Sequence, residues 1–404
     1  MENICAVVLS CFENEQSAPM TEAQILFKPV AVWTAEAIRK SGIEDICIAG
    51  TIKSKEFKSE GIKVFSAEKK LNAGEALALA KDFINEHKDK AIMIISASVP
   101  SILEDSLKSA VKYHKDFGAT AALTVYQEGD NESGAVIGVI AKAAQIMKNI
   151  DKAETISDLV NKAHKISIVC KRLRNSAGVK ALSDMLREKI LEKHILGGVY
   201  IPCADGVIIG PDVKIEAGTT ILPGTIINGK SEIGKDCFIG PNSFVADSLI
   251  GDKVIFKSSF TEKSAVGDGT YVGPFSNLRA NTSIGKNVKI GDFVEVKNSN
   301  VGDKTSIAHL TYVGDSDVGK NVNFGCGSVT VNYDGKNKHR TTIGDNVFIG
   351  CNTNFIAPVK VFSNTYIAAG STITNDVPEN ALAIARSRQI IKENWVTKRE
   401  GREV

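Results

Sequence analysis

The feature that most limits the fold of this chain is an aliphatic residue at every sixth position of its second half. Two series are unbroken: Val266, Val272, Leu278, Ile284, Ile290 and Val296, and then Ile343, Ile349, Phe355, Val361, Ile367 and Ile373. Six is a multiple of the two-residue period of a strand but not of the 3.6-residue period of a helix. Glycine follows many of these residues and permits tight corners. The spacing predicts a left-handed parallel β-helix with about 18 residues per triangular coil.

The register is interrupted between Thr330 and Ile343. Phe324 and Thr330 keep the spacing, but Ile343 comes seven residues later than the next expected position. The segment 331–342 is polar and basic and contains Asp334-Gly335, a turn signal. Because interruptions of a repeat form loops, often on the binding face, we predict a projecting loop here. Its composition favours a ligand-binding loop, and the alternative is a solvated corner without a role.

His309 is the candidate general base, because histidine titrates near neutral pH. It lies two positions after the inward-facing Ile307, on a face that can reach a surface groove. Spacing alone favours a packed or surface histidine without a catalytic role. A cluster one or two coils away favours a site: Arg279, Lys297, Tyr312 and Asn323. Fixed cations at this spacing can hold a phosphate, bidentately in the case of arginine.

The first 177 residues alternate apolar runs with helical patterns, which predicts an α/β domain with a parallel sheet between helices. The expected strands are 4–9, 46–49, 91–95 and 119–125, and the expected helices are 29–41, 72–86 and 101–113, with Asn72 as a helix cap. No glycine-rich turn follows the first strand to cradle a phosphate, so we expect a folded domain without a working nucleotide site.

An amphipathic helix is expected at 178–195, ended by Gly197-Gly198. The predicted parts are therefore a Rossmann-like α/β domain at 1–177, a linker helix at 178–198 and the β-helix domain with a C-terminal tail at 199–404.

The composition excludes several classes of protein. The 49 Lys and Arg residues balance 47 Asp and Glu residues, which argues against nucleic-acid binding. No apolar run approaches the roughly 18 residues of a membrane helix, and the N-terminus lacks the basic start of a secretory signal. The eight cysteines include no C-x-x-C pair, as expected for free thiols in a reducing cytoplasm. We expect a cytoplasmic protein that binds neither nucleic acid nor membrane.

Several motifs in the second half are more specific than the repeat. They are Gly273-Pro274-Phe275 with Leu278-Arg279, Phe293-Val294-Glu295-Val296-Lys297, Ala308-His309-Leu310-Thr311-Tyr312, Val331-Asn332-Tyr333-Asp334-Gly335 and Asn380-Ala381-Leu382. With them, the chain from about Gly198 to Trp395 resembles the acetyltransferase half of the bifunctional N-acetylglucosamine-1-phosphate uridyltransferase/glucosamine-1-phosphate N-acetyltransferase family. The strand–helix order of 1–177 and Lys28-Pro29 resemble its uridyltransferase half.

The resemblance implies acetyl transfer from acetyl-coenzyme A to the amine of glucosamine 1-phosphate. His309 would accept the proton, Glu295 would orient this histidine, and Lys338 would neutralise charge near the phosphate or the developing oxyanion. The implied sugar-phosphate contacts are Arg279, Lys297, Tyr312 and Asn323, and the implied coenzyme contacts are Cys326, Asn332, Tyr333, Cys351, Ala369 and Arg386.

Two of these coenzyme positions depart from the family, since Cys326 and Cys351 replace the usual alanine and serine. Both replacements are small, so we expect weakened or retuned coenzyme binding. The resemblance also implies a homotrimer, in which the segment 391–404 reaches a neighbour's site.

The uridyltransferase motifs depart much more. The family's L-x-A-G-x-G-T-x-M segment reads Leu9-Ser10-Cys11-Phe12-Glu13-Asn14-Glu15-Gln16-Ser17-Ala18-Pro19-Met20, with glutamates facing the triphosphate. The magnesium-binding G-D-x-P segment reads Ala97-Ser98-Val99-Pro100, so Ser98 replaces the metal-binding carboxylate. A serine hydroxyl is a poor ligand for Mg²⁺. We expect no metal site and loss of uridyltransferase activity.

The leading hypothesis is a single-activity glucosamine-1-phosphate N-acetyltransferase in UDP-N-acetylglucosamine biosynthesis, which supplies peptidoglycan of the cell wall. The alternatives are a fully bifunctional enzyme that also uses UTP, an acetyltransferase for another amino sugar, and a non-catalytic partner subunit.

Overall fold

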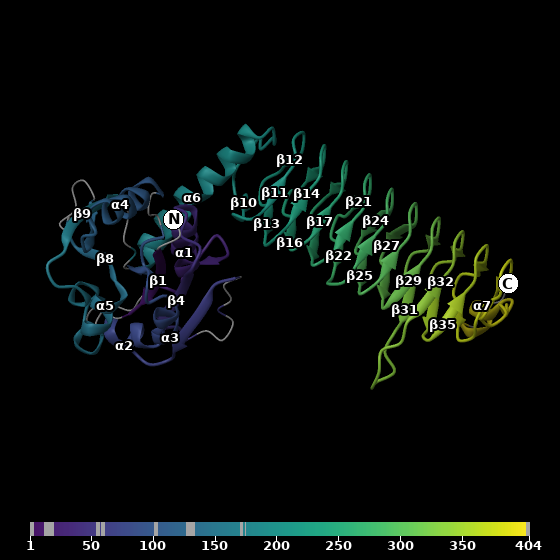
Figure 1. The fold of residues 1–404 in the computed structure, drawn as a ribbon. Coiled ribbons are helices and arrows are strands. Elements are labelled where there is room, and N and C mark those ends of the chain that lie inside the picture. Colours follow the sequence, from purple (N-terminus) through teal and green to yellow (C-terminus); the bar gives the residue numbers. More distant parts are fainter. Residues whose placement is uncertain are drawn as a thin grey trace. The chain divides into compact units, whose positions relative to one another are not determined.

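The computed structural model describes residues 4–11, 20–53, 57, 61–100, 104–126, 134–169, 173 and 175–400. Residues 12–19 of the degenerate 9–20 segment lie outside this description. The chain divides into two compact units, Met1–Glu188 and Lys189–Val404, each with its own apolar core (Figure 1). The boundary between the units falls within the predicted linker.

The first unit is built on a seven-stranded sheet of order β5-β4-β1-β6-β8-β7-β9. The strands are β1 (Ile4–Ser10), β4 (Ile46–Thr51), β5 (Lys63–Ala67), β6 (Ala91–Ser96), β7 (Ala121–Tyr126), β8 (Val136–Lys142) and β9 (His164–Val169). The prediction of a parallel sheet is wrong for β8, which is antiparallel to β6 and β7. The connection from β7 to β8, residues 127–135, is shorter than the dozen or so residues of a parallel crossover.

Helices cover both faces of this sheet, as the alternating pattern predicts. They are α1 (Val30–Lys40), α2 (Ala73–Ala78), α3 (Lys81–Glu86), α4 (Glu104–Phe117) and α5 (Ala143–Asn149), with the 3-10 turns η1 (Ile150–Lys152) and η2 (Ile156–Leu159) and the short pair β2 (Gln24–Ile25) and β3 (Lys28–Pro29). Helices α1 and α4 pack on one face, and α2, α3 and α5 pack on the other. The helix predicted at 72–86 is two helices, α2 and α3, in the structure. Residues 101–103 of the helix predicted at 101–113 lie outside the described residues. The cap is confirmed, since Asn72 Oδ1 accepts a hydrogen bond from Glu75 N at 2.8 Å.

Helix α6 (Ser176–Leu196) confirms the expected amphipathic helix before Gly197. Its first half contributes Leu182 to a cluster with Ile25 and Val30 of the first unit. Its second half contributes Leu191 to the core of the second unit. One continuous helix therefore supplies apolar side chains to both cores.

The second unit is a β-helix of three parallel sheets, as the six-residue spacing predicts. Sheet I holds β10 (Ile208–Ile209), β13 (Ile226–Asn228), β16 (Phe244–Ala246), β19 (Phe260–Glu262), β22 (Asn277–Leu278), β25 (Glu295–Lys297), β28 (Tyr312–Gly314), β31 (Val329–Val331), β34 (Asn354–Ile356) and β37 (Thr372–Ile373). Sheet II holds β11 (Lys214–Ile215), β14 (Glu232–Ile233), β17 (Leu249–Ile250), β20 (Ala265–Val266), β23 (Ser283–Ile284), β26 (Asn300–Val301), β29 (Ser316–Val318), β32 (Thr341–Ile343) and β35 (Val359–Val361). Sheet III holds β12 (Thr220–Ile221), β15 (Phe238–Ile239), β18 (Ile255–Phe256), β21 (Tyr271–Val272), β24 (Lys289–Asp292), β27 (Ser306–His309), β30 (Asn323–Phe324), β33 (Phe348–Ile349), β36 (Tyr366–Ile367) and β38 (Leu382–Ala383).

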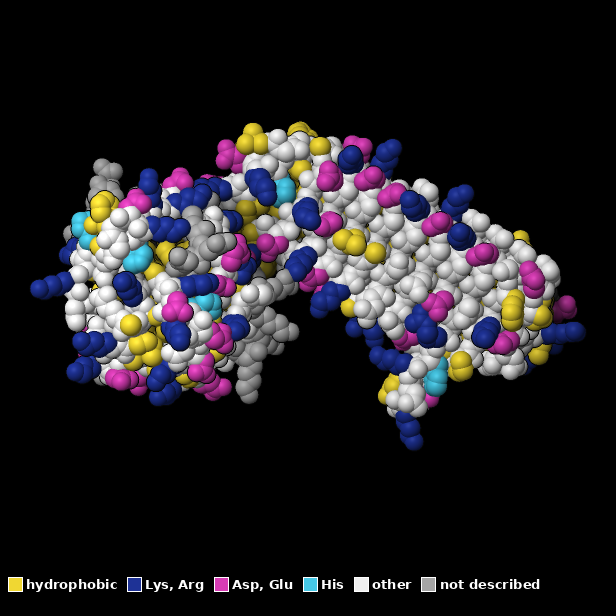
Figure 2. Space-filling model, viewed as in Figure 1, with side chains coloured by type: hydrophobic (Ala, Val, Ile, Leu, Met, Phe, Trp, Pro, Cys, Tyr) yellow, Lys and Arg dark blue, Asp and Glu magenta, His cyan; other side chains and the backbone are white. Residues whose placement is uncertain are grey.

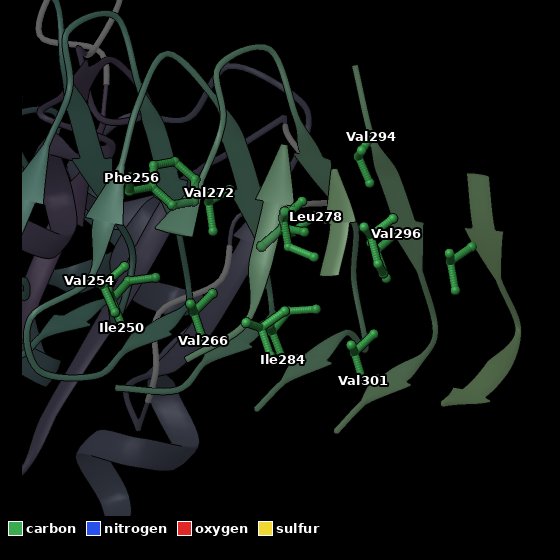
Figure 3. Packing of buried hydrophobic residues seen from close by; sticks show 14 of the residues in the cluster. Ile250, Val254, Phe256, Val266, Val272, Leu278, Ile284, Val294, Val296 and Val301 are labelled. Atoms are coloured by element: carbon green, nitrogen blue, oxygen red, sulfur yellow. The ribbon is translucent and has the colours of Figure 1, made fainter. Parts of the chain in front are cut away.

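The core of the β-helix is built mainly from the residues that repeat every six positions, and other buried residues such as Val254 and Val294 add to it. None of the twelve residues in the two unbroken series is more than 4 % exposed. Figure 3 shows members of this set, such as Val266, Val272 and Leu278, pointing into the interior from successive strands. The aliphatic period therefore sets which face of each strand is buried, and the side chains that alternate with these residues along the strands mostly face outward.

The predicted loop at 331–342 is a narrow hairpin that projects between β31 and β32 (Figure 1). Its two sides are joined by a bond from His339 N to Asn332 O of 2.8 Å and one from Asp334 N to Asn337 O of 3.2 Å. Beyond β38 the chain ends in α7 (Trp395–Glu400). None of the helices in the described residues has the length and apolar character needed to cross a membrane.

Candidate active site

Equivalent residues of successive coils lie one above the next at the corner where sheet III ends. Each comes two positions after an inward-facing residue of sheet III, and those inward residues pair in the order Ile290, Ile307, Phe324, Ile349 and Ile367. We call the resulting set the corner row: Asp292, His309, Cys326, Cys351 and Ala369. Four of its five members are predicted site residues. The register of the coils therefore brings these four residues to one edge of the β-helix.

His309 is oriented by a carboxylate of the neighbouring coil. Asp292 and His309 are directly paired between β24 and β27, and Asp292 Oδ1 lies 2.8 Å from His309 Nδ1. This hydrogen bond holds the pKa of Asp292 below its usual value. The two side chains are 41 % and 56 % exposed, so the imidazole is accessible. The contact directs Nδ1 towards the carboxylate and leaves Nε2 for a substrate.

Glu295, which the resemblance assigns to orient His309, contacts Arg279 instead. Arg279 Nη1 donates to Glu295 Oε1 at 2.8 Å, and this bond raises the pKa of Arg279. The reason is the corner between the two residues, since Glu295 lies on β25 of sheet I whereas His309 ends β27 of sheet III. Asp292 is the carboxylate at His309. Counting coils would have located it, because Asp292 and His309 each follow an inward residue by two positions.

A cationic cluster lies around β25 and β28, three residues past the corner row. Glu295 pairs directly with Tyr312, and Lys297 lies two positions further along the strand that carries Glu295. The ammonium of Lys338, from the hairpin, is close enough to Lys297 to lower the pKa of Lys297. Lys and Arg side chains gather at and beside the projecting hairpin in Figure 2. The cluster is suited to a phosphate dianion, because like charges that repel one another gain from a shared counter-ion.

This repulsion gives a prediction for Lys338→Ala. Removal of the Lys338 ammonium should raise the pKa of Lys297 towards its ordinary value, since the main cause of its depression is gone. The shift can be followed by NMR titration of isotopically methylated lysines. Lys336→Ala, at the hairpin tip, is the matched control and should leave the resonance of Lys297 unchanged. An unaltered pKa in Lys338→Ala would show that the two ammonium groups do not meet.

A buried carboxylate connects the hairpin to the cationic cluster. Asp315 is 5 % exposed; burial raises its pKa, but hydrogen bonds from Asn298 and Asn332 outweigh this effect and lower it. Asn332 Nδ2 also lies 3.4 Å from the Tyr312 hydroxyl. A Cβ at Gly314 would collide with the Tyr312 ring, so glycine allows this tyrosine to fold over the strand. The motifs single out neither Asp315 nor Gly314, and no residue type or spacing distinguishes them.

The hairpin is fixed by its own carboxylate. Asp334 Oδ1 accepts from the backbone N–H groups of Lys336 and Asn337, both at 2.7 Å, and Asp334 Oδ2 contacts His339 Nε2 at 2.8 Å. These bonds, that from Asn337 first, lower the pKa of Asp334 to about 2. Because the folded hairpin lowers this pKa, the ionised carboxylate stabilises the hairpin at pH values above the ordinary pKa of 3.8. This stabilisation is lost only as the pH falls towards 2. Tyr333 is exposed on this hairpin, and its hydroxyl donates to Gly335 O at 2.7 Å.

The remaining predicted residues, Asn323 and Arg386, lie elsewhere in the second unit. Asn323 is exposed on the outer face of β30, one coil beyond Ser306 of β27. Arg386 is exposed and lies over Gly370, next to Ala369 of the corner row. An open groove of about 600 Å³ runs beside His309 and is also lined by Tyr271, Pro274, Lys289 and Asp292. The structure thus places most predicted residues of the second unit in the corner row, the cationic cluster or the hairpin, and places Asn323 and Arg386 outside these three groups.

The first unit has small hydroxyl side chains at the carboxyl ends of its central strands. Ser98, the predicted replacement of the metal-binding carboxylate, follows β6, and its Oγ lies 2.7 Å from Ser96 Oγ. Ser10, at the end of β1, has its Oγ 2.6 Å from Thr21 Oγ1. Within the described ranges, no three His, Cys, Asp or Glu side chains are arranged to hold a metal ion.

Comparison with known proteins covers the whole chain. Residues 212–247, 263–298 and 340–375 match the family described as bacterial transferase hexapeptide (six repeats). The bifunctional protein GlmU of Acetivibrio thermocellus is 37% identical, over 99% of this chain and 98% of the relative. That of Caldanaerobacter subterraneus subsp. tengcongensis is 38% identical over 99% of both chains, and that of Clostridium acetobutylicum is 35% identical over 98% of both. This chain is a member of the GlmU family.

Proposed function

We propose that this chain transfers an acetyl group from acetyl-coenzyme A to the amine of glucosamine 1-phosphate, in the synthesis of UDP-N-acetylglucosamine. The observation that carries the proposal is the Asp292–His309 pair at a corner beside a cluster of three cations, Arg279, Lys297 and Lys338. Membership in the GlmU family supports it. A base next to a phosphate-binding cluster is what an acceptor with both an amine and a phosphate requires.

The chemistry needs a proton acceptor for the attacking amine. The Nε2 of His309 accepts a proton from the amine as its nitrogen attacks the thioester carbonyl, and the carboxylate of Asp292 stabilises the resulting imidazolium. The new C–N bond forms, the C–S bond breaks, and coenzyme A leaves as a thiol with the proton that Nε2 took from the amine. An ammonium of Lys338 is suited to stabilise negative charge that develops on the carbonyl oxygen or remains on the phosphate.

The sugar phosphate is proposed to lie across the corner from His309. Arg279 and Lys297 would hold its phosphate, while Tyr312 and Asn323 would contact the sugar ring. The bond from Arg279 to Glu295 supports this arrangement, because it fixes the guanidinium before a ligand arrives. The coenzyme would contact the corner row at Cys326, Cys351 and Ala369. The family motifs add three further coenzyme contacts: Asn332, Tyr333 and Arg386.

We further propose that the first unit has lost uridyltransferase activity. The hydroxyl of Ser98 is engaged by Ser96, and the carboxylate that would hold Mg²⁺ is absent at this position.

A homotrimer is also proposed. The C-terminal segment presents exposed apolar side chains at Ile390, Ile391, Trp395 and Val396. Exposed apolar surface of this kind favours contact with another chain. Sedimentation of the purified protein should give the mass of three chains, and the mass of one chain would contradict the proposal.

The test of the function is release of free coenzyme A from acetyl-coenzyme A with glucosamine 1-phosphate as acceptor. Turnover is expected with this acceptor, and omission of the acceptor is the control for simple thioester hydrolysis. Other amino sugars are assayed in parallel, and a higher kcat/KM for one of them would assign that sugar instead. Absence of turnover with every acceptor, together with mixed trimers on co-expression with a bifunctional relative, would replace the proposal by a non-catalytic partner role. Pyrophosphate release from UTP and N-acetylglucosamine 1-phosphate with Mg²⁺ would show that the protein is a bifunctional enzyme.

Asp292→Asn tests the positioning of the base. The amide keeps the size of the side chain but removes the charge that stabilises the imidazolium, so kcat should fall by about 10- to 100-fold while KM for the sugar changes little. Asp303→Asn is the matched control, because Asp303 accepts a backbone bond from Lys286 at 2.8 Å at a corner away from His309. Equal losses in both variants would indicate a structural role for Asp292 only.

A further inference from the structure

Two cysteines of the corner row lie opposite one another on neighbouring coils. Phe324 pairs with Ile349, and each cysteine follows two residues later. Backbone bonds flank the pair on both sides: Gly325 N donates to Ile349 O at 2.8 Å, and Asn352 N donates to Cys326 O at 2.8 Å. Cys326 and Cys351 therefore occupy the same position of successive coils, although 25 residues separate them along the chain.

Their spacing fits a disulfide. Neighbouring strands of a sheet lie about 4.8 Å apart, within the roughly 4.4–6.8 Å between the Cα atoms of bridged cysteines. Cys326 is half-buried and Cys351 is exposed, and both are free thiols. Equivalent corner positions direct their side chains to the same side of the prism, so the two thiols can meet without a change of register.

The other described cysteines differ in ways that matter for reactivity. Cys5, Cys11, Cys47 and Cys237 are buried, and burial raises the pKa of Cys5 to about 12. A thiol with such a pKa is a poor nucleophile at neutral pH. Cys203 is exposed but precedes the first strand of the β-helix. Among the described residues, Cys326 and Cys351 are thus the pair that is both accessible and aligned.

We propose that Cys326 and Cys351 form a thiol-modification site that low-molecular-weight disulfides, including the disulfide of coenzyme A, oxidise to an intramolecular bridge. The thiolate of the exposed Cys351 attacks one sulfur of the small disulfide, whose S–S bond breaks and releases one thiol after it takes up a proton. The thiolate of Cys326 then attacks the sulfur of Cys351 and releases the second thiol. The protein loses two hydrogen atoms and two electrons, and the small disulfide becomes two thiols.

The bridge would inactivate the acetyltransferase reversibly, and this consequence rests on the proposed function. The corner row places Cys326 one coil from His309 and Cys351 one coil from Ala369. A bond between the two sulfurs therefore changes the surface on which the coenzyme is proposed to lie, next to the base. The bridge itself needs no acetyltransferase activity, since it depends only on register and exposure.

Mass spectrometry tests the site without reference to turnover. The reduced full-length protein is incubated with coenzyme A disulfide, alkylated with N-ethylmaleimide and mapped by peptides. A cross-linked peptide pair containing Cys326 and Cys351 is expected. Cys326→Ala should stop at a mixed disulfide of coenzyme A on Cys351, and Cys203→Ser should form the same bridge as the parent. Alkylation of both Cys326 and Cys351 while Cys203 carries coenzyme A would overturn the proposal, as would separate mixed disulfides without a bridge.

Turnover of the same samples separates this inference from the proposed function. The oxidised parent should lose most of its acetyltransferase activity and recover it with dithiothreitol. In Cys351→Ser the ratio of activity after and before oxidation should stay near unity, whatever its activity in the reduced state. If the bridge forms but the protein shows no acetyltransferase activity, the proposed function is wrong and the thiol-modification site stands. If the protein acetylates but forms no bridge, the proposed function stands and the thiol-modification site is wrong.

Discussion

His309→Ala should lower kcat for coenzyme A release by about 10²- to 10⁴-fold, the usual contribution of a positioned general base. The imidazole is the proposed proton acceptor of the corner row, and its Nδ1 is already engaged by Asp292 at 2.8 Å. Its loss leaves the cationic cluster intact, so KM for the sugar phosphate should change little. Steady-state kinetics with both substrates near saturation measure the effect.

Two controls make this result specific to the base. The side chain of His309 is 56 % exposed, so the variant should unfold at the temperature of the parent. His87→Ala removes an imidazole from the first compact unit and should retain turnover. Activity of His309→Ala equal to that of the parent would remove His309 from the mechanism and with it the proposed reaction. In the same variant the pKa of Asp292 should rise towards its ordinary value, because its main hydrogen bond is lost.

Phe256→Ala should have the largest effect on stability, about 3–5 kcal/mol of unfolding free energy. Phe256 is fully buried and is stacked in register between Ile239 and Val272 of the adjacent coils. Figure 3 shows its ring inside the coil near Val272. The coils are held in place by their continuous backbone ladders, so they cannot close over the cavity that alanine leaves.

The matched control is Phe260→Ala, one corner further along the same coil. Phe260 is 56 % exposed and stacks on Phe244 with ring centroids 5.8 Å apart. Such a surface contact contributes only about 1 kcal/mol. Urea unfolding followed by circular dichroism at a fixed protein concentration compares the two variants. Equal destabilisation would mean that the interior of the prism relaxes around the cavity, contrary to the packing observed.

Some of the site could be predicted because it depends on local order in the chain. The hairpin follows from the seven residues that break the spacing between Thr330 and Ile343. The exposure of His309 follows from its place two positions after the buried Ile307. Family motifs supplied the roles of the remaining residues, but a motif carries no distances. For this reason the resemblance pairs His309 with Glu295, whereas in the structure Asp292 contacts this histidine.

The sequence by itself determined that the second half is a β-helix, because a six-residue period of aliphatic residues has one repetitive solution and each coil buries its own members. It also indicated the alternation of strands and helices in the first unit, but neither the strands β5, β8 and β9 nor the antiparallel direction of β8. Only the tertiary structure decided which polar side chains meet across coils. Asp292 and His309 are 17 residues apart, and Cys326 and Cys351 are 25 apart because the hairpin lengthens their coil. Contacts between coils depend on the number of residues in each coil. This number varies, so the six-residue period alone does not predict which polar side chains meet.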